Sequence, residues 1–208
     1  TVNGRVVDTL GVKVTPADDV RVNGERMKGE PKTYIVMNKP RGYVTTLSDD
    51  HAEKSVMDLI AGKCEQRVFP VGRLDKMTMG VLLFTNDGEL TEKLTHPSYN
   101  RKKIYQTRLD MNLKQSDMEK LVNGIELEDG MMHVDQIAYI DNDEKEIGLE
   151  IHSGKNRVVR RLFEALGYKV KKLDRVYFAG LTKKNLKRGQ WRFLTEEEVN
   201  MLITGFYQ

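Results

Sequence analysis

Arg73 and Asp75 stand shortly before an apolar run at residues 81–84, which predicts a strand in the interior of a sheet. Charged side chains at the mouth of a buried strand are costly unless they are paired or take part in function. A carboxylate in such a place can act as a nucleophile or a base on a nucleoside, provided that an arginine from elsewhere in the chain holds its charge. Asp75 is therefore the first candidate catalytic residue.

A second chemistry also uses an aspartate in this kind of context. Residues 75–78 read Asp-Lys-Met-Thr and partly match the phosphate-accepting motif of aspartyl-phosphate enzymes. That motif has a glycine before the threonine, whereas this chain has Met77, and no second acidic motif indicates a magnesium site. These details disfavour a phosphotransferase.

Candidate charge partners lie on a helix predicted for residues 156–166, which Gly167 ends. Its apolar face comprises Val158, Val159, Leu162, Phe163 and Leu166. Its other face carries Arg157, Arg160, Arg161 and Glu164. Arginine supplies a planar fork that suits carboxylate or phosphate, although a solvated face is the plainer interpretation. The preceding Ser-Gly-Lys-Asn at 153–156 adds a weak signal for a phosphate at a helix N-terminus.

The distribution of charge along the chain points to a polyanionic partner. Residues 109–150 hold 12 acidic and 3 basic side chains, whereas residues 151–192 hold 13 basic and 2 acidic ones. Such segregation is typical of a chain that binds nucleic acid, and a basic face without a ligand is the alternative interpretation.

The composition excludes several classes of protein. No run approaches the roughly 18 apolar residues that a membrane helix needs. No charged-then-apolar leader opens the sequence either, so we expect a soluble, cytoplasmic protein without a membrane partner. A single cysteine, Cys64, excludes an internal disulfide framework. The four histidines lack ligand spacing, so we predict no metal site.

The elements that must position these residues mix strands and helices without a strict βαβ rhythm. Strands are predicted at 34–37, 67–71, 80–85, 104–109, 134–140 and 147–151. Helices are predicted at 55–61, 88–95, 116–123 and 156–166. Ser116 is the predicted N-cap of the third helix, and Gly124 follows its end. This order predicts an α+β fold with a largely antiparallel, mixed sheet flanked by helices.

Residues 1–25 form a separate predicted β piece. Asn-Gly pairs within 1–7 and 20–24 accompany strand-like alternation and predict hairpin turns. The piece is too short to bury a core alone, and residues 26–31 read as a linker. We therefore expect the main domain at residues 32–208.

Four ordered motifs resemble those of the rRNA pseudouridine synthases of the RsuA/RluB type, a family that includes RluE and RluF. Residues 72–75 (GRLD), followed by Thr78, Gly80 and 85–88 (TNDG), match the family's catalytic motif. The other three motifs are 38–42 (NKPRG), 103–105 (KIY), and 154–157 (GKNR) with 160–162 (RRL), and the tail 188–192 (RGQWR) also resembles the family. The match spans about residues 31–199. The N-terminal hairpin resembles the end of an S4 RNA-binding domain, whose leading helices are absent from this sequence.

The resemblance implies an isomerase that converts a specific uridine of ribosomal RNA to pseudouridine. The uridine must leave the RNA stack before an enzyme can reach its glycosidic bond. The resemblance assigns Asp75 the attack on the ribose, or the abstraction of a ribose proton, and it pairs Arg160 with this aspartate. It stacks Tyr105 on the uracil, where the tyrosine hydroxyl helps to remove the C5 proton.

Further residues are implied to bind the substrate. Arg73 would occupy the space that the flipped nucleotide leaves, or hold that nucleotide, and a structural salt bridge is its other interpretation. Leu173 would pack beneath the base, although a plain core leucine fits equally well. Leu74 and Thr78 belong to the same site through the catalytic motif. The candidates for contacts to the RNA are Lys39, Lys103, Lys155, Asn156, Arg157 and Arg161.

The sequence departs from the family pattern at two places. Val158 and Val159 stand where the family has a glutamine shortly before the arginine pair, so that contact is lost. Met79 replaces a smaller or polar residue before Gly80. Neither change touches the expected nucleophile.

An isomerisation needs no cofactor, and we expect none. The expected partner is structured ribosomal RNA, bound by a monomer. Residues 38–42, 69–71 and 189–192 favour the members of the family that act on large-subunit rRNA. A non-catalytic RNA-binding or ribosome-assembly protein with the same fold is the alternative hypothesis.

Overall fold

The computed structural model describes residues 1–15, 17–47, 54–99 and 101–206, and it divides into two compact units, Thr1–Lys32 and Thr33–Gln208. The first unit holds one two-stranded sheet, made of β1 (Arg21–Val22) and β2 (Glu25–Arg26). Both residues of each Asn-Gly pair have positive φ angles, of 50° and 79° at 3–4 and of 51° and 84° at 23–24. Such angles are those of hairpin turns of type I′, as the pairs predict. Arg26, the first residue of the predicted linker, is the last residue of β2.

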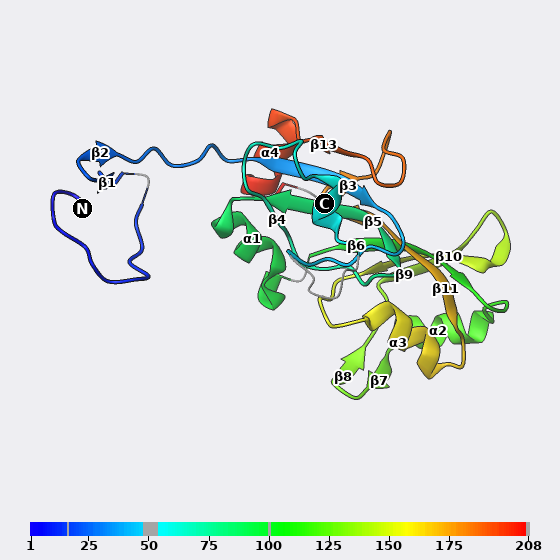
Figure 1. The fold of residues 1–208 in the computed structure, drawn as a ribbon. Helices are drawn as coiled ribbons and strands as arrows, with labels where there is room; N and C mark the ends of the chain where they lie inside the picture. Colours follow the sequence, from blue (N-terminus) through cyan, green and yellow to red (C-terminus); the bar gives the residue numbers. More distant parts are fainter. Residues whose placement is uncertain (16, 48–53, 100, 207–208) are drawn as a thin grey trace. The chain divides into compact units, whose positions relative to one another are not determined.

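The second unit is built on one nine-stranded sheet (Figure 1). Its main path runs in the order β13 (Trp191–Phe193), β3 (Tyr34–Lys39), β5 (Thr78–Thr85), β11 (Val170–Phe178), β6 (Lys103–Leu109), β10 (Asp143–Ile151) and β9 (Gln136–Ile140). Two short strands extend it: β4 (Phe69–Pro70) pairs with β5, and β12 (Leu181–Thr182) pairs with β11. In the described sheet β5 and β11 pair in parallel and the other pairs are antiparallel. The predicted α+β class with a largely antiparallel, mixed sheet is confirmed.

Helices flank this sheet in the second unit (Figure 1). They are α1 (Gly88–Thr95), α2 (Gln115–Asn123), α3 (Val158–Ala165) and α4 (Glu196–Thr204), with the 3₁₀ turns η1 (Val56–Leu59) and η2 (Pro97–Tyr99). A separate small hairpin joins β7 (Ile125–Leu127) to β8 (Gly130–Met132). No helix in the described part of the chain is long and apolar enough to cross a lipid bilayer.

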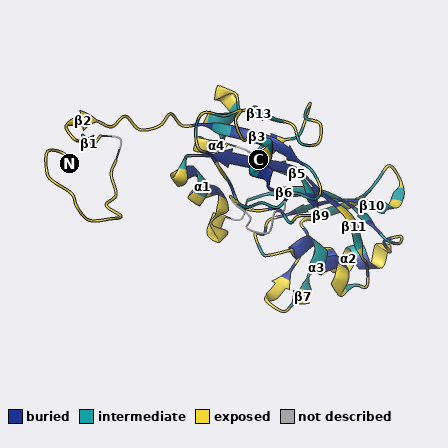
Figure 2. Cartoon of the chain, viewed as in Figure 1, coloured by how far each residue is buried: buried dark blue, intermediate teal, exposed yellow. Residues whose placement is uncertain are grey.

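The apolar run at 81–84 is buried because β5 is covered on both of its faces (Figure 2). Val81 and Leu83 belong to a core that also contains Leu90 of α1 and Leu202 of α4. The alternate residues Leu82 and Phe84 pack instead with Val56 of η1 and its neighbours. Successive side chains of a strand point to opposite faces, so a continuous apolar run is what a strand buried on two sides requires.

A third core cluster supports the other half of the sheet. Leu121 of α2 and Leu162 and Phe163 of α3 pack with Leu149 of β10 and with Tyr105 of β6. The apolar face predicted for residues 156–166 is thus the buried face of α3. The arginines of the opposite face are left free to point away from this core.

The tail motif at 188–192 fixes the far edge of the sheet. Arg188 and Lys183 both form ion pairs with the carboxylate of Asp174 on β11, and Arg188 donates to Oδ1 of Asn38 on β3 at 2.6 Å. Trp191 donates from Nε1 to the carbonyl of Leu59 at 3.0 Å. These contacts make the tail a structural clamp on β3 and β11.

Most predicted elements are present, with shifted ends. The segment predicted as a helix at 55–61 is the 3₁₀ turn η1, which Ser55 caps through a capping box. Helix α2 begins at Gln115 and its N-cap is Lys114, so the N-cap assigned to Ser116 is wrong. Strand β11, the hairpin β7–β8, strand β13 and helix α4 were not predicted.

Candidate active site

Asp75 lies on the loop that joins β4 to β5, and the end of β3 holds this loop in place. Nζ of Lys39 donates to the carbonyl oxygens of Asp75, Lys76 and Thr78 at 3.0, 3.2 and 2.7 Å. Thr45 donates from Oγ1 to the carbonyl of Leu74 at 2.8 Å. The backbone around the carboxylate is therefore fixed by hydrogen bonds, as a preorganised site requires.

Two arginines approach the carboxylate of Asp75. Nη1 of Arg157 donates to Oδ2 at 3.0 Å, and Nε of Arg160 lies 3.7 Å from the same oxygen. The Arg160 side chain is 11% exposed and the Arg157 side chain 50%. Burial lowers the pKa of Arg160, and nearby Arg157 acts in the same direction, whereas Asp75 raises it. The predicted pairing of Asp75 with Arg160 is thus present as a close approach, and Arg157 supplies the hydrogen bond.

The start of helix α3 aims Arg157 at this carboxylate. Arg157 occupies the N-cap position with φ 49° and ψ 27°, in the left-handed region, and it makes no side-chain capping bond. A residue other than glycine pays free energy for this conformation, which persists only where the surroundings impose it. The ion pair between the Arg157 guanidinium and Asp75 offsets part of this cost.

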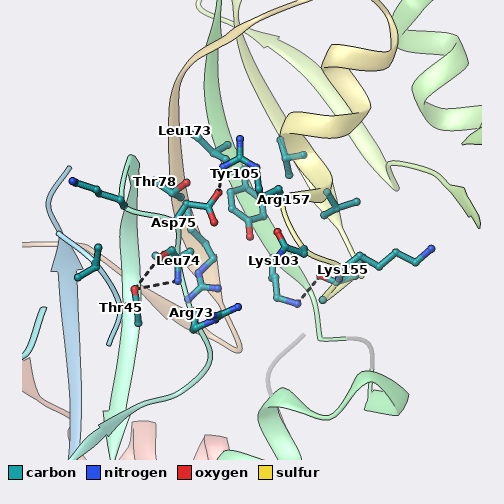
Figure 3. Close-up of a pocket in the computed structure, with 18 of the residues that line it drawn as sticks. Thr45, Arg73, Leu74, Asp75, Thr78, Lys103, Tyr105, Lys155, Arg157 and Leu173 are labelled. Atoms are coloured by element: carbon teal, nitrogen blue, oxygen red, sulfur yellow. Dashed lines mark hydrogen bonds and ion pairs between the residues drawn. The ribbon is translucent and has the colours of Figure 1, made fainter. Parts of the chain in front are cut away.

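A pocket of about 590 Å³ opens beside Asp75 (Figure 3). Ten of the thirteen predicted site residues line it: Arg73, Leu74, Asp75, Thr78, Lys103, Tyr105, Lys155, Asn156, Arg157 and Leu173. They come from the 71–77 loop, β5, β6, β11 and the segment before α3. In Figure 3 the carboxylate of Asp75 faces the ring of Tyr105 across the pocket. A pocket of this size accommodates one nucleotide-sized group.

The pairing register of β5, β6 and β11 determines which side chains form one wall of this pocket. Leu173 of β11 pairs with Thr78 of β5 on one side and with Thr107 of β6 on the other. Two residues further along β11, Arg175 pairs with Tyr105 of β6. Tyr105 and Leu173 are 9% and 5% exposed, so both present apolar surface from the wall of the pocket.

Lys39 does not line the pocket, and its assignment as an RNA contact is wrong. The side chain is fully buried, and besides the three carbonyls of the Asp75 loop it donates to the carbonyl of Pro40 at 3.2 Å. Burial lowers its pKa to about 8, against the opposing effect of Asp75. With its ammonium enclosed by backbone carbonyls, this lysine shapes the loop and cannot reach a phosphate.

Two other predicted cations are bound to the tip of the β7–β8 hairpin. Arg161 makes a two-pronged ion pair with Asp129, at 2.8 and 3.1 Å, and it lies outside the pocket. Nζ of Lys155 donates to the carbonyl of Asp129 at 2.6 Å. Asp129 therefore anchors both α3 and the segment before it to the hairpin.

Lys103 lies inside the pocket. Its Nζ donates to the carbonyl of Ser153 at 2.8 Å. Burial and the neighbouring Arg175 lower its pKa to about 8. This lysine is available to an anion in the pocket only while it carries its proton.

Sequence reasoning missed Arg175, which lines the pocket from β11 and is 4% exposed. It also missed residues 44–46, which complete the wall. The stretch 170–178 (VKKLDRVYF) has no regular alternation of polar and apolar residues, so nothing in its pattern indicates that one of its cations is buried.

Among the residues that the structure describes, one group of potential metal ligands comes together, and none of its members lines the pocket. Ligand atoms of Asp135, Glu150 and His152 lie within 4.8 Å of one another. Asp135 and Glu150 are half-buried, His152 is exposed, and Glu150 also pairs with Lys102 at 3.0 Å. The histidine spacing in the sequence did not reveal this group.

Comparisons with known proteins agree with the geometry of the site. A family model described as RNA pseudouridylate synthase matches residues 33–165. A Bacillus subtilis protein named ribosomal large subunit pseudouridine synthase B is 42% identical, over 97% of this chain and 84% of its own length. An Aquifex aeolicus protein named uncharacterized RNA pseudouridine synthase is 39% identical, over 97% and 82%. A crystal structure of a pseudouridylate synthase is similar with a TM-score of 0.74 and 25% identity, over 97% of this chain and 87% of that one.

Proposed function

The chain belongs to the RNA pseudouridylate synthase family and is an isomerase that acts on RNA, and we propose that its substrate is a specific uridine of 23S ribosomal RNA. The single observation that carries the proposal is the placement of Asp75. Two guanidinium groups approach its carboxylate, and Asp75 lines a nucleotide-sized pocket together with Tyr105. The name of the Bacillus subtilis relative supports the large subunit as the source of the substrate.

The reaction begins with eversion of the uridine into the pocket. Arg73 is exposed at the edge of the pocket, where it can fill the space that the base leaves or hold the flipped nucleotide. The ring of Tyr105 stacks on the uracil and Leu173 packs beneath it. Lys103, Lys155 and Asn156 are placed to position the RNA backbone.

Asp75 then detaches the base, either by attack on the ribose C1′ or by abstraction of a ribose proton. Arg157 and Arg160 stabilise the carboxylate in its reactive, charged form. The freed uracil rotates and rejoins the ribose through C5. Removal of the C5 proton, in which the Tyr105 hydroxyl takes part, completes the product.

We assign residues 1–25 to the end of an S4-like RNA-binding domain, joined through a linker at 26–31 to a catalytic domain at 32–208. The protein acts as a cytoplasmic monomer in ribosome biogenesis, without a cofactor or a metal.

Replacement of Asp75 tests the proposal. Asp75→Asn should slow tritium release from a 23S rRNA transcript that contains [5-³H]uridine by at least about a thousandfold, with RNA affinity retained. The matched control is Asp143→Asn, which removes a surface carboxylate paired with Arg108. A stable or slowly resolved adduct with 5-fluorouridine RNA should form with the wild type and not with Asp75→Asn.

Two results would reject the proposal. Failure of the wild type to release tritium, with every cellular role intact in Asp75→Asn, would support the non-catalytic RNA-binding protein. A magnesium-dependent, labile acyl phosphate on Asp75 would support the phosphotransferase. Mapping of pseudouridine in ribosomal RNA from a strain without the gene identifies the target nucleotide.

A further inference from the structure

Arg175 is a buried cation that no carboxylate neutralises in the described part of the chain. The residue is 4% exposed, and its Nε and Nη2 both donate to the carbonyl of Val81, at 2.9 and 2.8 Å. An unpaired buried charge carries a large desolvation cost, so its retention calls for a group that uses it.

The surroundings of Arg175 increase the positive charge at this wall. Its guanidinium lies 4.5 Å from the ring centre of Phe178, and Nζ of Lys103 lies 5.9 Å from the same ring. Burial lowers the pKa of Arg175, and its charge in turn lowers the pKa of Lys103. Two cations therefore share one aromatic ring beside the pocket, and an anion that forms there would be stabilised.

Tyr105 is the group in the pocket that is placed to use this charge. It lies directly opposite Arg175 in the register of β6 and β11, and both residues line the pocket. Directly opposed residues of an antiparallel pair project to the same face of the sheet, with Cβ atoms about 5 Å apart. The Tyr105 side chain also raises the pKa of Arg175, against the larger effect of burial.

We propose that Arg175 is a positioning residue that acts through Tyr105 and stabilises negative charge on the phenol oxygen while the C5 proton of the rearranged uracil is removed. The inference rests on the proposed function and extends it, because it assigns the buried cation to one step of that reaction. An interaction that strengthens only as charge develops lowers the barrier of its own step and leaves the other steps unchanged.

Removal of the C5 proton is balanced by protonation of N1. The C5–H bond breaks and its electron pair becomes part of the C5=C6 bond of the product. The pair displaced from the C6=N1 bond takes up a proton at N1, which a water molecule carries from the Tyr105 hydroxyl. The C5 proton replaces it on the phenol oxygen, so the enzyme is restored.

The step can be separated from those before it by the choice of substrate. With 5-fluorouridine RNA the base is detached and rejoined, but no C5 proton is present to remove. Arg175→Lys should slow tritium release from [5-³H]uridine 23S transcript by about tenfold or more, and single-turnover conversion of the 5-fluorouridine transcript should stay within about threefold of wild type. Arg108→Lys, a change at a half-exposed arginine of the neighbouring strand β6, is the matched control for both assays.

Tyr105→Phe provides the second arm, which does not depend on the folding of the Arg175 variant. It should show the same selective loss, and Arg175→Lys added to it should change tritium release by less than about threefold, because the two residues act as a unit. Equal loss of both reactions in Tyr105→Phe, full additivity in the double variant, or an unchanged tritium release in folded Arg175→Lys would overturn the proposal. Absence of tritium release by the wild type would instead reject the proposed function.

Discussion

Arg157 and Asp75 form the closest ion pair of the candidate active site, with Nη1 of the arginine 3.0 Å from Oδ2 of the aspartate. Arg160, the partner that the sequence motif indicates, lies 3.7 Å from the same oxygen and is much less exposed. Arg157 is thus the nearer partner of Asp75 and Arg160 the more buried one. The contribution of each arginine to catalysis can be measured separately.

Arg160→Ala should reduce turnover more than Arg157→Ala does. A half-exposed pair is screened by water, whereas the buried guanidinium acts in a lower dielectric and also donates to Val170 and Thr78. We expect losses of about a hundredfold for Arg160→Ala and about tenfold for Arg157→Ala in single-turnover tritium release. A larger loss in Arg157→Ala would show that the shorter contact dominates.

Lys39→Met should destabilise the protein by about 3 kcal/mol, because four backbone carbonyls lose their common, buried donor. Chemical denaturation measures this loss, with the exposed Lys169→Met as the control. The dependence of RNA affinity on salt should not change. A salt slope that falls by about one with stability unchanged would instead restore Lys39 as a phosphate contact.

The contrast between Lys39 and Arg160 shows what the sequence could predict. Both residues stand in family motifs, so the sequence alone identifies them as candidate site residues. Only the fold shows that the Lys39 ammonium faces backbone carbonyls and that Arg160 approaches the Asp75 carboxylate. The strong periodicity of residues 156–166 and the Asn-Gly pairs predicted local structure because those signals are themselves local. Strand β11 was missed because Lys171, Lys172 and Asp174 interrupt its apolar residues and leave no regular alternation, and Arg175 was missed with it.

Gly80→Ala should be among the most damaging single changes in the chain. Gly80 has φ +109°, and a Cβ atom there would lie 2.1 Å from the carbonyl oxygen of Arg175. We expect a loss of at least about 3 kcal/mol, or roughly 10 °C in Tm. Gly148→Ala is the control, because its Cβ would meet Ile140 at an ordinary 3.6 Å. Similar Tm values for the two variants would contradict the close approach of β5 to β11.

RNA affinity should fall as the pH rises through the pKa of Lys103, which is about 8. Below this pH the amine is protonated and attracts phosphate, and above it the amine is neutral, so affinity weakens several-fold between about pH 7 and about pH 9. Lys103→Arg should flatten the profile, since arginine stays charged throughout. The measurement is filter binding at constant ionic strength, and an unaltered profile in Lys103→Arg would exclude Lys103 as the titrating contact.

The wide sequence separation of the paired groups has a consequence for biosynthesis. Arg157 follows Asp75 by 82 residues. Strand β3 pairs with β13, which comes later still in the chain and places Trp191 opposite Met37. A nascent chain therefore displays its aspartate long before the arginines have been translated. The candidate active site can therefore form only after residues 157–193 have been translated and have paired with the earlier strands.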